Sequence, residues 1–581
     1  MRGVARVTAE DIPVGTPAAD TVPMWHRGMA LLAVVSMLIG TRQVWTDAVT
    51  VSPVLTLVHS ATYGAILVLA VLALVVPSLR AMVLVDAAIL VLGVVHVIAG
   101  YAVHPLPGDE GALTAQAAKA ILGGEHIYGV PWPEVFHQPG VGLTKTMDGG
   151  ADLTYAYPPL APVLTAAAMR VVPILHAYPN LAATAVTTGA LIAGAIALWL
   201  LLPVGWRSAG TAITLGYPLL PTYAWLGYPA VITVALLIPV VVRWPATGAG
   251  GNLRRFGVAR AILLGAACAA HQLGWFIAPF LLVGLFAVRR GELSARSALL
   301  VVARFAAIAA LTFLALNAVF AVHDGTAWLG GIFTPMLQHA VPHGQGLIGI
   351  SYYLTGASGA LDFYSYATLL FALAALVASI LFMRSLGPAL TVIPWLTFYL
   401  SVRSQDGYYL LMTPLWLAAV ATVPRTAFAE AWQPRPGVLQ GQRTRLATGG
   451  LVFAPALLCL GIAVSTAAPF RMQIVSADAH GAGVRGLWRL TVVVENVSGR
   501  PLVPHFAVST NQSMSAYWRQ QAGPKTLAPQ QRATYTLVAA NPKGYNPGSR
   551  DFFKLRAVTD HPQTLSSVTI PVPPPPGGDA G

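Results

Sequence analysis

Long apolar runs separated by short polar breaks occupy most of the chain between residues 29 and 465. A helix needs roughly 20 predominantly apolar residues to cross a bilayer, and several of these runs reach that length. Others are shorter or contain Pro and Gly, which a membrane tolerates only where protein or a cavity covers the freed backbone groups. The pattern therefore predicts a polytopic α-helical membrane protein with about a dozen passes, some of them short and broken. The predicted passes are Met29–Trp45, Leu55–Val76, Met82–Val103, Pro159–Val172, Leu181–Leu202, Thr222–Val242, Ala261–Val288, Ala298–Val322, Ala367–Met383, Ala389–Leu400, Tyr408–Val423 and Leu451–Ser465.

The stretch CAAHQLGWFIAPFLL (268–282) contains the clearest interruption of an apolar run. Arg residues flank it on both sides, which places its two ends on the same face of the membrane and predicts a broken hairpin. His271 and Gln272 stand at the tip of this hairpin. Ionisable residues inside a membrane are functional candidates by default, although a His at this position can also simply cap a helix.

The pattern changes after the last apolar run. RGLWRLTVVVENVSGRPLVPHFAVST (485–510) and TLAPQQRATYTLVAANPKG (526–544) alternate apolar with polar residues and are punctuated by Gly, Pro and Asn. Alternation of this kind predicts short strands, and we expect a β-sandwich over residues 467–570. The end of the chain, residues 571–581, is Pro- and Gly-rich and is expected to be disordered.

Composition and charge agree with a membrane protein and indicate its orientation. The chain has 581 residues, of which 56% are hydrophobic and 9% charged, and a net charge of +13. The basic residues are mostly Arg in clusters between apolar runs, so we interpret them as cytoplasmic anchors of a plasma-membrane protein and not as a nucleic-acid surface. This orientation predicts a cytoplasmic segment 1–27, a membrane domain 28–466 with outer loops 104–155 and 323–366, and an extracytoplasmic C-terminal domain.

The first predicted outer loop contains the stretch GDEGALTAQAAKAILGGEHIYG (108–129). Asp109 and Glu110 follow shortly after a predicted pass, and the residues after them favour a helix along the membrane surface. Partial desolvation there would raise a carboxylate pKa toward a value useful for a general base. A long solvated loop is also simply polar, and that is the better interpretation of most of its other charged residues. We select Asp109 and Glu110 as the catalytic candidates, without a preference between them.

Four short segments together resemble a known family. An acid after an early pass and a helix of small residues precede GGEHIYG (123–129), YAYPPLAPVL (155–164), HGQGLIGI (343–350) and SVRSQDGYYLLMTPLW (401–416). This order resembles the GT-C superfamily of glycosyltransferases, most closely the polyprenyl-phosphate-mannose-dependent mannosyltransferases of actinobacteria. The third segment is similar to an Asn-Gln-Ser-Leu-x-Gly segment of that branch, with Gly346 in place of Ser. The chain also departs from the family in having two additional passes before the acidic loop.

The resemblance implies an inverting enzyme with a GT-C-like membrane domain. Such an enzyme moves one sugar, mannose or arabinofuranose, from a polyprenyl-phosphate donor to a glycolipid, cell-wall glycan or protein acceptor on the outer membrane face. A lone phosphate leaving group needs cationic or hydrogen-bonding partners but no metal bridge, so we expect neither a cofactor nor an obligatory metal. The candidates for the donor phosphate are Arg403, His271, Gln272 and His343, and those for the substrates are Tyr128, Tyr155, Tyr157, Gln345, His339 and Tyr408.

Two other functional classes stay open at this point. A secondary transporter also uses broken helices, but it would be expected to show internal repeats and acids inside its passes, whereas the acids here concentrate in loops. A non-catalytic glycan-binding scaffold would use the C-terminal domain as its binding module. Trp488, Tyr517 and Trp518 could stack on sugar rings there, although burial in the sandwich core is the more ordinary role for such residues.

Overall fold

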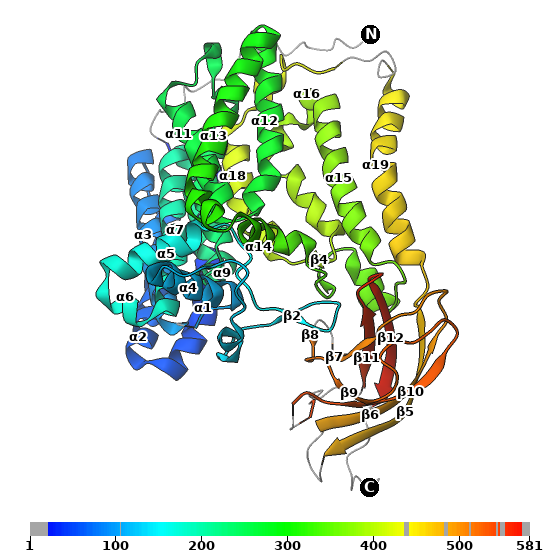
Figure 1. The fold of residues 1–581 in the computed structure, drawn as a ribbon. Helices are drawn as coiled ribbons and strands as arrows, with labels where there is room; N and C mark the ends of the chain where they lie inside the picture. The colour runs from blue at the N-terminus through cyan, green and yellow to red at the C-terminus, as the bar shows by residue number, and fades with distance from the viewer. Residues whose placement is uncertain are drawn as a thin grey trace, which may run out of the picture. The chain divides into compact units, whose positions relative to one another are not determined.

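The computed structural model describes residues 21–104, 106–434, 441–480, 486–510, 513–541, 544–545 and 552–571. Most of the described chain is helical, and the strands of its C-terminal part follow the last long helix (Figure 1). Most of the predicted cytoplasmic segment, residues 1–20, and the predicted tail from residue 572 onward lie outside the described residues.

Eight helices among the described residues are long and apolar enough to cross a membrane. This result confirms the predicted multi-pass membrane character. Three further apolar segments, Leu160–Val171, Ala230–Val241 and Gly407–Thr422, are only 10 to 17 residues long. The eight long helices are α1 (Met24–Val51), α2 (Pro53–Val75), α3 (Leu79–Val103), α7 (Pro179–Leu201), α12 (Leu273–Glu292), α13 (Ala295–His323), α15 (Asp362–Leu381) and α19 (Gln442–Ser465).

The remaining helices are shorter and connect or flank the long ones. They are α4 (Asp109–Gly123), α5 (Leu160–Val171), α6 (Pro173–Ala177), α8 (Arg207–Thr211), α9 (Leu219–Trp225), α10 (Ala230–Val241), α11 (Arg254–Ala270), α14 (Gly325–Leu337), α16 (Met383–Leu386), α17 (Gly407–Leu410) and α18 (Thr413–Thr422). Because α11 ends at Ala270 and α12 begins at Leu273, the helical break lies at the predicted position, His271 and Gln272.

The chain divides into two compact units. The first comprises the described residues up to Val103 together with Leu198–Pro218, and the second comprises the rest. Inside the first unit a buried carboxylate joins three helices: Asp86 of α3 contacts His26 of α1 through Oδ2, at 2.8 Å from Nε2, and accepts a hydrogen bond from the hydroxyl of Ser208 in α8 through Oδ1. All three side chains are buried, so the polar contacts tie these helices together at a point that water does not reach.

The C-terminal part of the second unit contains two four-stranded antiparallel sheets. Their inner faces share one hydrophobic core, in which Val492 and Tyr535 of one sheet and Phe506 and Leu555 of the other are fully or almost fully buried. The alternating burial along β6 is the period of two that the sequence shows. The first sheet is ordered β5 (Phe470–His480), β6 (Gly486–Asn496), β10 (Arg532–Val538) and β9 (Arg519–Ala522); the second is β12 (Thr564–Pro571), β11 (Phe552–Thr559), β7 (His505–Thr510) and β8 (Ser513–Met514).

This sheet region contacts both of the predicted outer loops. A hairpin of the first loop, β1 (Thr144–Lys145) and β2 (Ala151–Asp152), meets it where the Lys145 ammonium donates to the carbonyl of Met514 at 2.9 Å. The Tyr517 hydroxyl donates to the carbonyl of Thr146 at 2.7 Å. From the second loop, Ser358 pairs with Leu565 through two backbone hydrogen bonds. The sheet region is therefore held against the loops that carry the candidate site residues.

Candidate active site

The first turn of α4 brings the two candidate acids against the turn between α9 and α10. The backbone N–H of Gly108 donates to the carbonyl of Leu226 at 2.9 Å. A Cβ at Gly111 would lie only 2.2 Å from the same carbonyl oxygen, so only glycine permits this approach. Asp109 and Glu110, which lie between these two glycines, are thereby placed beside that turn, which contains Tyr228.

Asp109 is half-buried and hydrogen-bonded on one oxygen. Its Oδ1 accepts from the backbone N–H of Glu110 at 3.0 Å and from the hydroxyl of Tyr228 at 3.4 Å. Burial raises the pKa of Asp109, and the two hydrogen bonds together with the positive charge of Arg403 only partly oppose that increase. The carboxylate therefore lies in a less hydrated environment than an ordinary loop acid.

Glu110 is the more strongly perturbed acid of the pair. Burial, and then the neighbouring charge of Asp109, raise its pKa to about 8, whereas a hydrogen bond with Tyr157 and the charge of Arg403 lower it. Its Oε2 atom is shielded from solvent and has no hydrogen-bond partner among the described residues. Because burial and the charge of Asp109 raise the pKa of Glu110 to about 8, Glu110 holds a proton near neutral pH and can exchange it with a bound molecule.

Arg403 supplies positive charge close to both acids. It begins β4 (Arg403–Ser404), which pairs in parallel with β3 (His343–Gly344), and its Nη1 donates to the Thr144 hydroxyl at 3.2 Å. Within the described part of the chain, no ion pair joins Arg403 to Asp109 or Glu110. Burial, followed by the charge of Arg403, lowers the pKa of Lys145. Two neighbouring cations that repel each other favour the binding of an anion between or beside them.

The helical break at His271 and Gln272 positions the predicted tyrosine segment. The Gln272 amide nitrogen donates to the carbonyls of Ala156 and Ile332, at 2.8 and 2.9 Å. The ring of His271 stacks on that of Tyr157 with centroids 5.0 Å apart, and its Nδ1 accepts from the N–H of Leu273 at the start of α12. His271 therefore caps a helix and also supports Tyr157, the residue that hydrogen-bonds Glu110.

The other two predicted tyrosines, Tyr155 and Tyr128, hydrogen-bond the backbone of the segment that carries Tyr157. Tyr155 is fully buried, and its hydroxyl donates to the carbonyl of Pro158 at 3.2 Å. The hydroxyl of Tyr128 donates to the backbone carbonyl of Tyr157 at 2.8 Å. Both side chains hold the segment in place. Tyr155 interacts with Glu110 through charge, and Tyr157 is the member of the three that hydrogen-bonds this acid.

Three residues of this cluster, Tyr223, Tyr228 and Asp406, were not predicted from the sequence. The Tyr223 hydroxyl donates to Asp406 Oδ1 at 2.8 Å, and its ring packs edge-on against that of Tyr228 at 5.1 Å. Asp406 lies in the segment SVRSQDGYYLLMTPLW, but nothing in its spacing connects it with a tyrosine 183 residues earlier. Tyr408, which the sequence did indicate, interacts electrostatically with Arg403 and with both acids.

The segment HGQGLIGI lies alongside Arg403 and contributes mainly backbone. The N–H of Gln345 donates to the carbonyl of Ser404 at 2.8 Å, and His343 is paired with Arg403 in register. A Cβ at Gly346 would lie 2.3 Å from the Ser404 hydroxyl oxygen and 2.4 Å from the carbonyl oxygen of Tyr399. A Ser at position 346, as in the family segment, does not fit this packing without a shift of the neighbouring strand.

Two further features lie apart from the acids. His339, a predicted substrate residue, hydrogen-bonds Asp560 of the sheet region instead of any member of the cluster. A cavity of about 510 Å³ runs beside α4 and is lined by apolar residues such as Leu106 and Leu181 and by polar ones such as Lys119 and Asn180. Neither Asp109 nor Glu110 lines that cavity. The candidate reaction centre is therefore the cluster of acids, tyrosines and Arg403.

This cluster combines two carboxyls of raised pKa, a guanidinium that forms no ion pair with them and several phenols. Its chemistry is that of proton transfer beside an anion-binding site. No family model, no curated protein and no solved structure matches the chain.

Proposed function

We propose that the protein is a membrane glycosyltransferase that takes a single sugar from a polyprenyl-phosphate donor and transfers it with inversion to a hydroxyl of an acceptor. The observation that supports this most directly is Glu110, whose pKa is raised to about 8 and whose Oε2 has no hydrogen-bond partner among the described residues. A buried carboxylate oxygen without a hydrogen-bond partner destabilises the folded protein unless a group of a bound ligand donates a hydrogen bond to it during function.

In the proposed reaction, Asp109 or Glu110 accepts the proton of the acceptor hydroxyl. The hydroxyl oxygen then forms a bond with the anomeric carbon while the bond from that carbon to the donor phosphate oxygen breaks. The bonding electrons leave with the phosphate, so negative charge grows on the lipid phosphate. Arg403, assisted by Lys145, stabilises this charge, and Tyr157, Tyr228 and Tyr408 surround the sugar.

The proposal includes the finer architecture. The short helices complete about a dozen passes of a GT-C-like domain in the plasma membrane, and residues 467–570 form a β-sandwich on the outer face. The acceptor is a glycolipid, a cell-wall glycan or a protein, and the sugar is mannose or arabinofuranose. Support comes from the apolar helices, from the two sheets that share a core, and from the contacts between those sheets and the β1–β2 hairpin.

The test is transfer of labelled sugar from synthetic polyprenyl-phosphate mannose or arabinofuranose into membrane extracts. Wild type is compared with Asp109→Asn, Glu110→Gln and the control Glu125→Gln, which changes an exposed acid just after the same helix. Loss of a general base costs about 10²- to 10⁴-fold in rate, so at least one of the two site variants should lose that much while the control keeps wild-type activity.

The same assay separates the alternatives. Transfer that both site variants retain would remove these acids from the chemistry. If no donor supports transfer, uptake of labelled sugar into sealed vesicles would favour a transporter. Sugar binding without uptake or transfer would favour a glycan-binding scaffold.

A further inference from the structure

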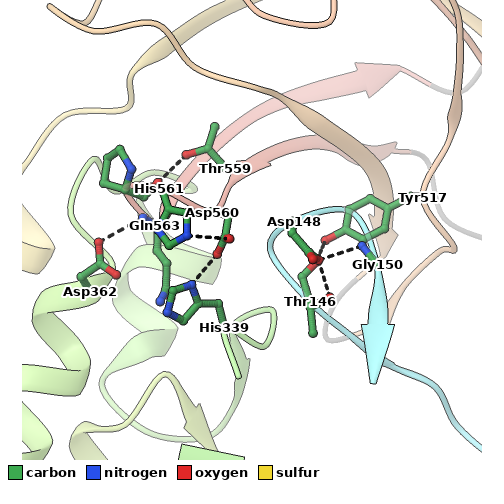
Figure 2. Close-up of polar contacts among 11 residues, drawn as sticks. Thr146, Asp148, Gly150, His339, Asp362, Tyr517, Thr559, Asp560, His561 and Gln563 are labelled. Carbon is green, nitrogen blue, oxygen red and sulfur yellow. Dashed lines mark hydrogen bonds and ion pairs between the residues drawn. The ribbon is translucent and has the colours of Figure 1, made fainter. Parts of the chain in front are cut away.

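A cluster of two histidines and one aspartate lies where the sheet region meets the second predicted outer loop. Asp560 and His561 belong to the turn between β11 and β12, and His339 follows α14 (Figure 2). Asp560 Oδ1 is hydrogen-bonded to His339 Nδ1, and its Oδ2 lies 3.2 Å from His561 Nε2. One ligand atom from each of the three residues lies within 4.8 Å of the other two.

We propose that His339, Asp560 and His561 bind one divalent transition-metal ion, with Zn²⁺ as the best-suited occupant. Zn²⁺ is bound by imidazole nitrogens and carboxylate oxygens at about 2.0–2.2 Å, so donors that share one ion lie within about 4.4 Å of each other, close to the 4.8 Å within which these three atoms lie. Water can complete a tetrahedral site. Calcium and magnesium prefer shells made of oxygen, which a set of two imidazoles and one carboxylate does not provide.

The turn that carries two of the ligands is held in place by its own hydrogen bonds. The Thr559 hydroxyl donates to the carbonyl of Pro562 at 2.6 Å and lies 2.7 Å from the Thr564 hydroxyl. The N–H of Gln563 donates to Asp362 Oδ2 at 3.0 Å, which ties the turn to the start of α15. A ligand pair on a fixed turn loses little freedom when the ion binds, which favours affinity.

The three side chains are also accessible to an ion. His339 and Asp560 are 36% and 24% exposed and His561 is 82% exposed, so the ion can enter without unfolding the contact. Asp148, drawn beside the cluster, is held within its own turn, where its Oδ1 accepts from the Thr146 hydroxyl and from the N–H of Gly150 (Figure 2).

The proposed ion would link the sheet region to the second predicted outer loop. It joins residues 221 positions apart in the chain, one from an outer loop and two from the sheet region. The sheet region also contacts the β1–β2 hairpin, in which the Thr144 hydroxyl accepts from Arg403. The ion would therefore also stabilise this hairpin beside the candidate active site. The inference does not rest on the proposed function, because a structural ion would serve a transporter or a scaffold equally well.

The test uses the full chain in detergent, without a polyhistidine tag, stripped by chelator and then titrated with ZnCl₂. Bound metal per chain is measured after desalting, and Co²⁺ is used separately as a spectroscopic probe of the ligand set. Wild type is compared with His561→Gln, Asp560→Asn and the double variant His339→Gln/His561→Gln. The matched control is His176→Gln, which changes an exposed histidine in α6.

We expect wild type and the control to bind one Zn²⁺ per chain and to melt at a higher temperature with Zn²⁺ than without it. His561→Gln should weaken Zn²⁺ binding at least tenfold, and the double variant should abolish both the binding and the thermal shift. Because His561 is exposed, its single variant should keep the metal-free melting temperature of wild type. Equal Zn²⁺ binding by wild type and the double variant, or no stoichiometric binding by wild type, would overturn the proposal and leave a hydrogen-bonded cluster only.

Discussion

Asp86 in the first unit and Glu110 in the second are both shielded from water, but they differ in how many of their carboxylate oxygens have a hydrogen-bond partner. Asp86 is fully buried and both of its oxygens have partners, the hydroxyl of Ser208 and the ring of His26. Glu110 has a hydrogen bond with Tyr157, but its Oε2 has no partner among the described residues although solvent does not reach it.

The difference separates a structural acid from a candidate functional one. Buried polar atoms in native proteins are nearly always hydrogen-bonded, and an exception calls for an explanation such as a ligand or a catalytic role. The contacts of Asp86 join three helices and leave no oxygen for a further molecule. Those of Glu110 leave one oxygen for such a molecule, beside a second acid and a guanidinium that is not paired with either.

The largest effect that bears on this comparison is expected from Arg403→Ala. If Arg403 serves a bound phosphate, its removal should lower the rate of sugar transfer by about 10²- to 10³-fold and leave thermal stability unchanged. Arg403→Lys should recover part of the rate, because an ammonium keeps the charge but not the two-pronged geometry. The measurement is the transfer assay with parallel thermal unfolding.

The control for this change is Arg471→Ala, which removes an exposed guanidinium in the sheet region. A large loss of stability in Arg403→Ala with no specific loss of transfer would show that the guanidinium merely compensates the two acids. The site would then lack its anion-binding component.

An intermediate effect is expected from Asp86→Asn, which keeps the shape of the side chain but replaces one acceptor oxygen by a donor. The amide keeps both partners only if the His26 ring or the Ser208 hydroxyl exchanges its donor role for an acceptor role, and the weakened buried contacts should cost about 1–3 kcal/mol. Unfolding by heat or denaturant should show this loss. Asp86→Asn that is as stable as wild type would mean that the buried group does not hold the helices together.

Glu110→Gln should have the opposite effect on stability. The folded pKa of Glu110, about 8, lies above its ordinary value of 4.5, so the wild-type protein loses stability as the pH rises through this window. The neutral amide avoids that loss. The gain in melting temperature should therefore be absent at about pH 4.5 or below and complete above about pH 8.

The smallest effect is expected from Tyr157→Phe, measured as a shift of the pH–rate profile. If Glu110 is the base, wild-type transfer should increase as the pH rises through about 8, because only the ionised carboxylate accepts the proton. Removing the phenol, which lowers the pKa of Glu110, should move this rise upward. A hydrogen bond of about 0.5–1.5 kcal/mol corresponds to about 0.4–1.1 pH units. A profile unaffected by both Tyr157→Phe and Glu110→Gln would assign the base role to Asp109.

Features that depend on neighbouring residues in the chain were predictable from the sequence. Apolar runs predicted the long helices, and the break that contains His and Gly predicted the gap between α11 and α12. The alternation of apolar and polar residues after Pro469 predicted the strands of the sheet region. The start of α4 at Asp109 was also accessible, because small residues and good helix formers follow it. Hydropathy alone did not decide which of the shorter apolar runs form complete membrane passes, because the length of each helix and the position of its breaks depend on packing against other helices.

The partners of the two acids were decided only by the tertiary structure. Tyr228 reaches Asp109 across 119 residues, and His339 reaches Asp560 across 221. The pairing of Leu198–Pro218 with the first three helices likewise follows from packing and not from order in the chain. Local patterns determine where helices and strands form, because each of these elements repeats apolar and polar positions with its own period along the chain. Which side chains complete a carboxylate, and which oxygen is left without a partner, depends on contacts between distant segments, and a single sequence contains no local signal for them.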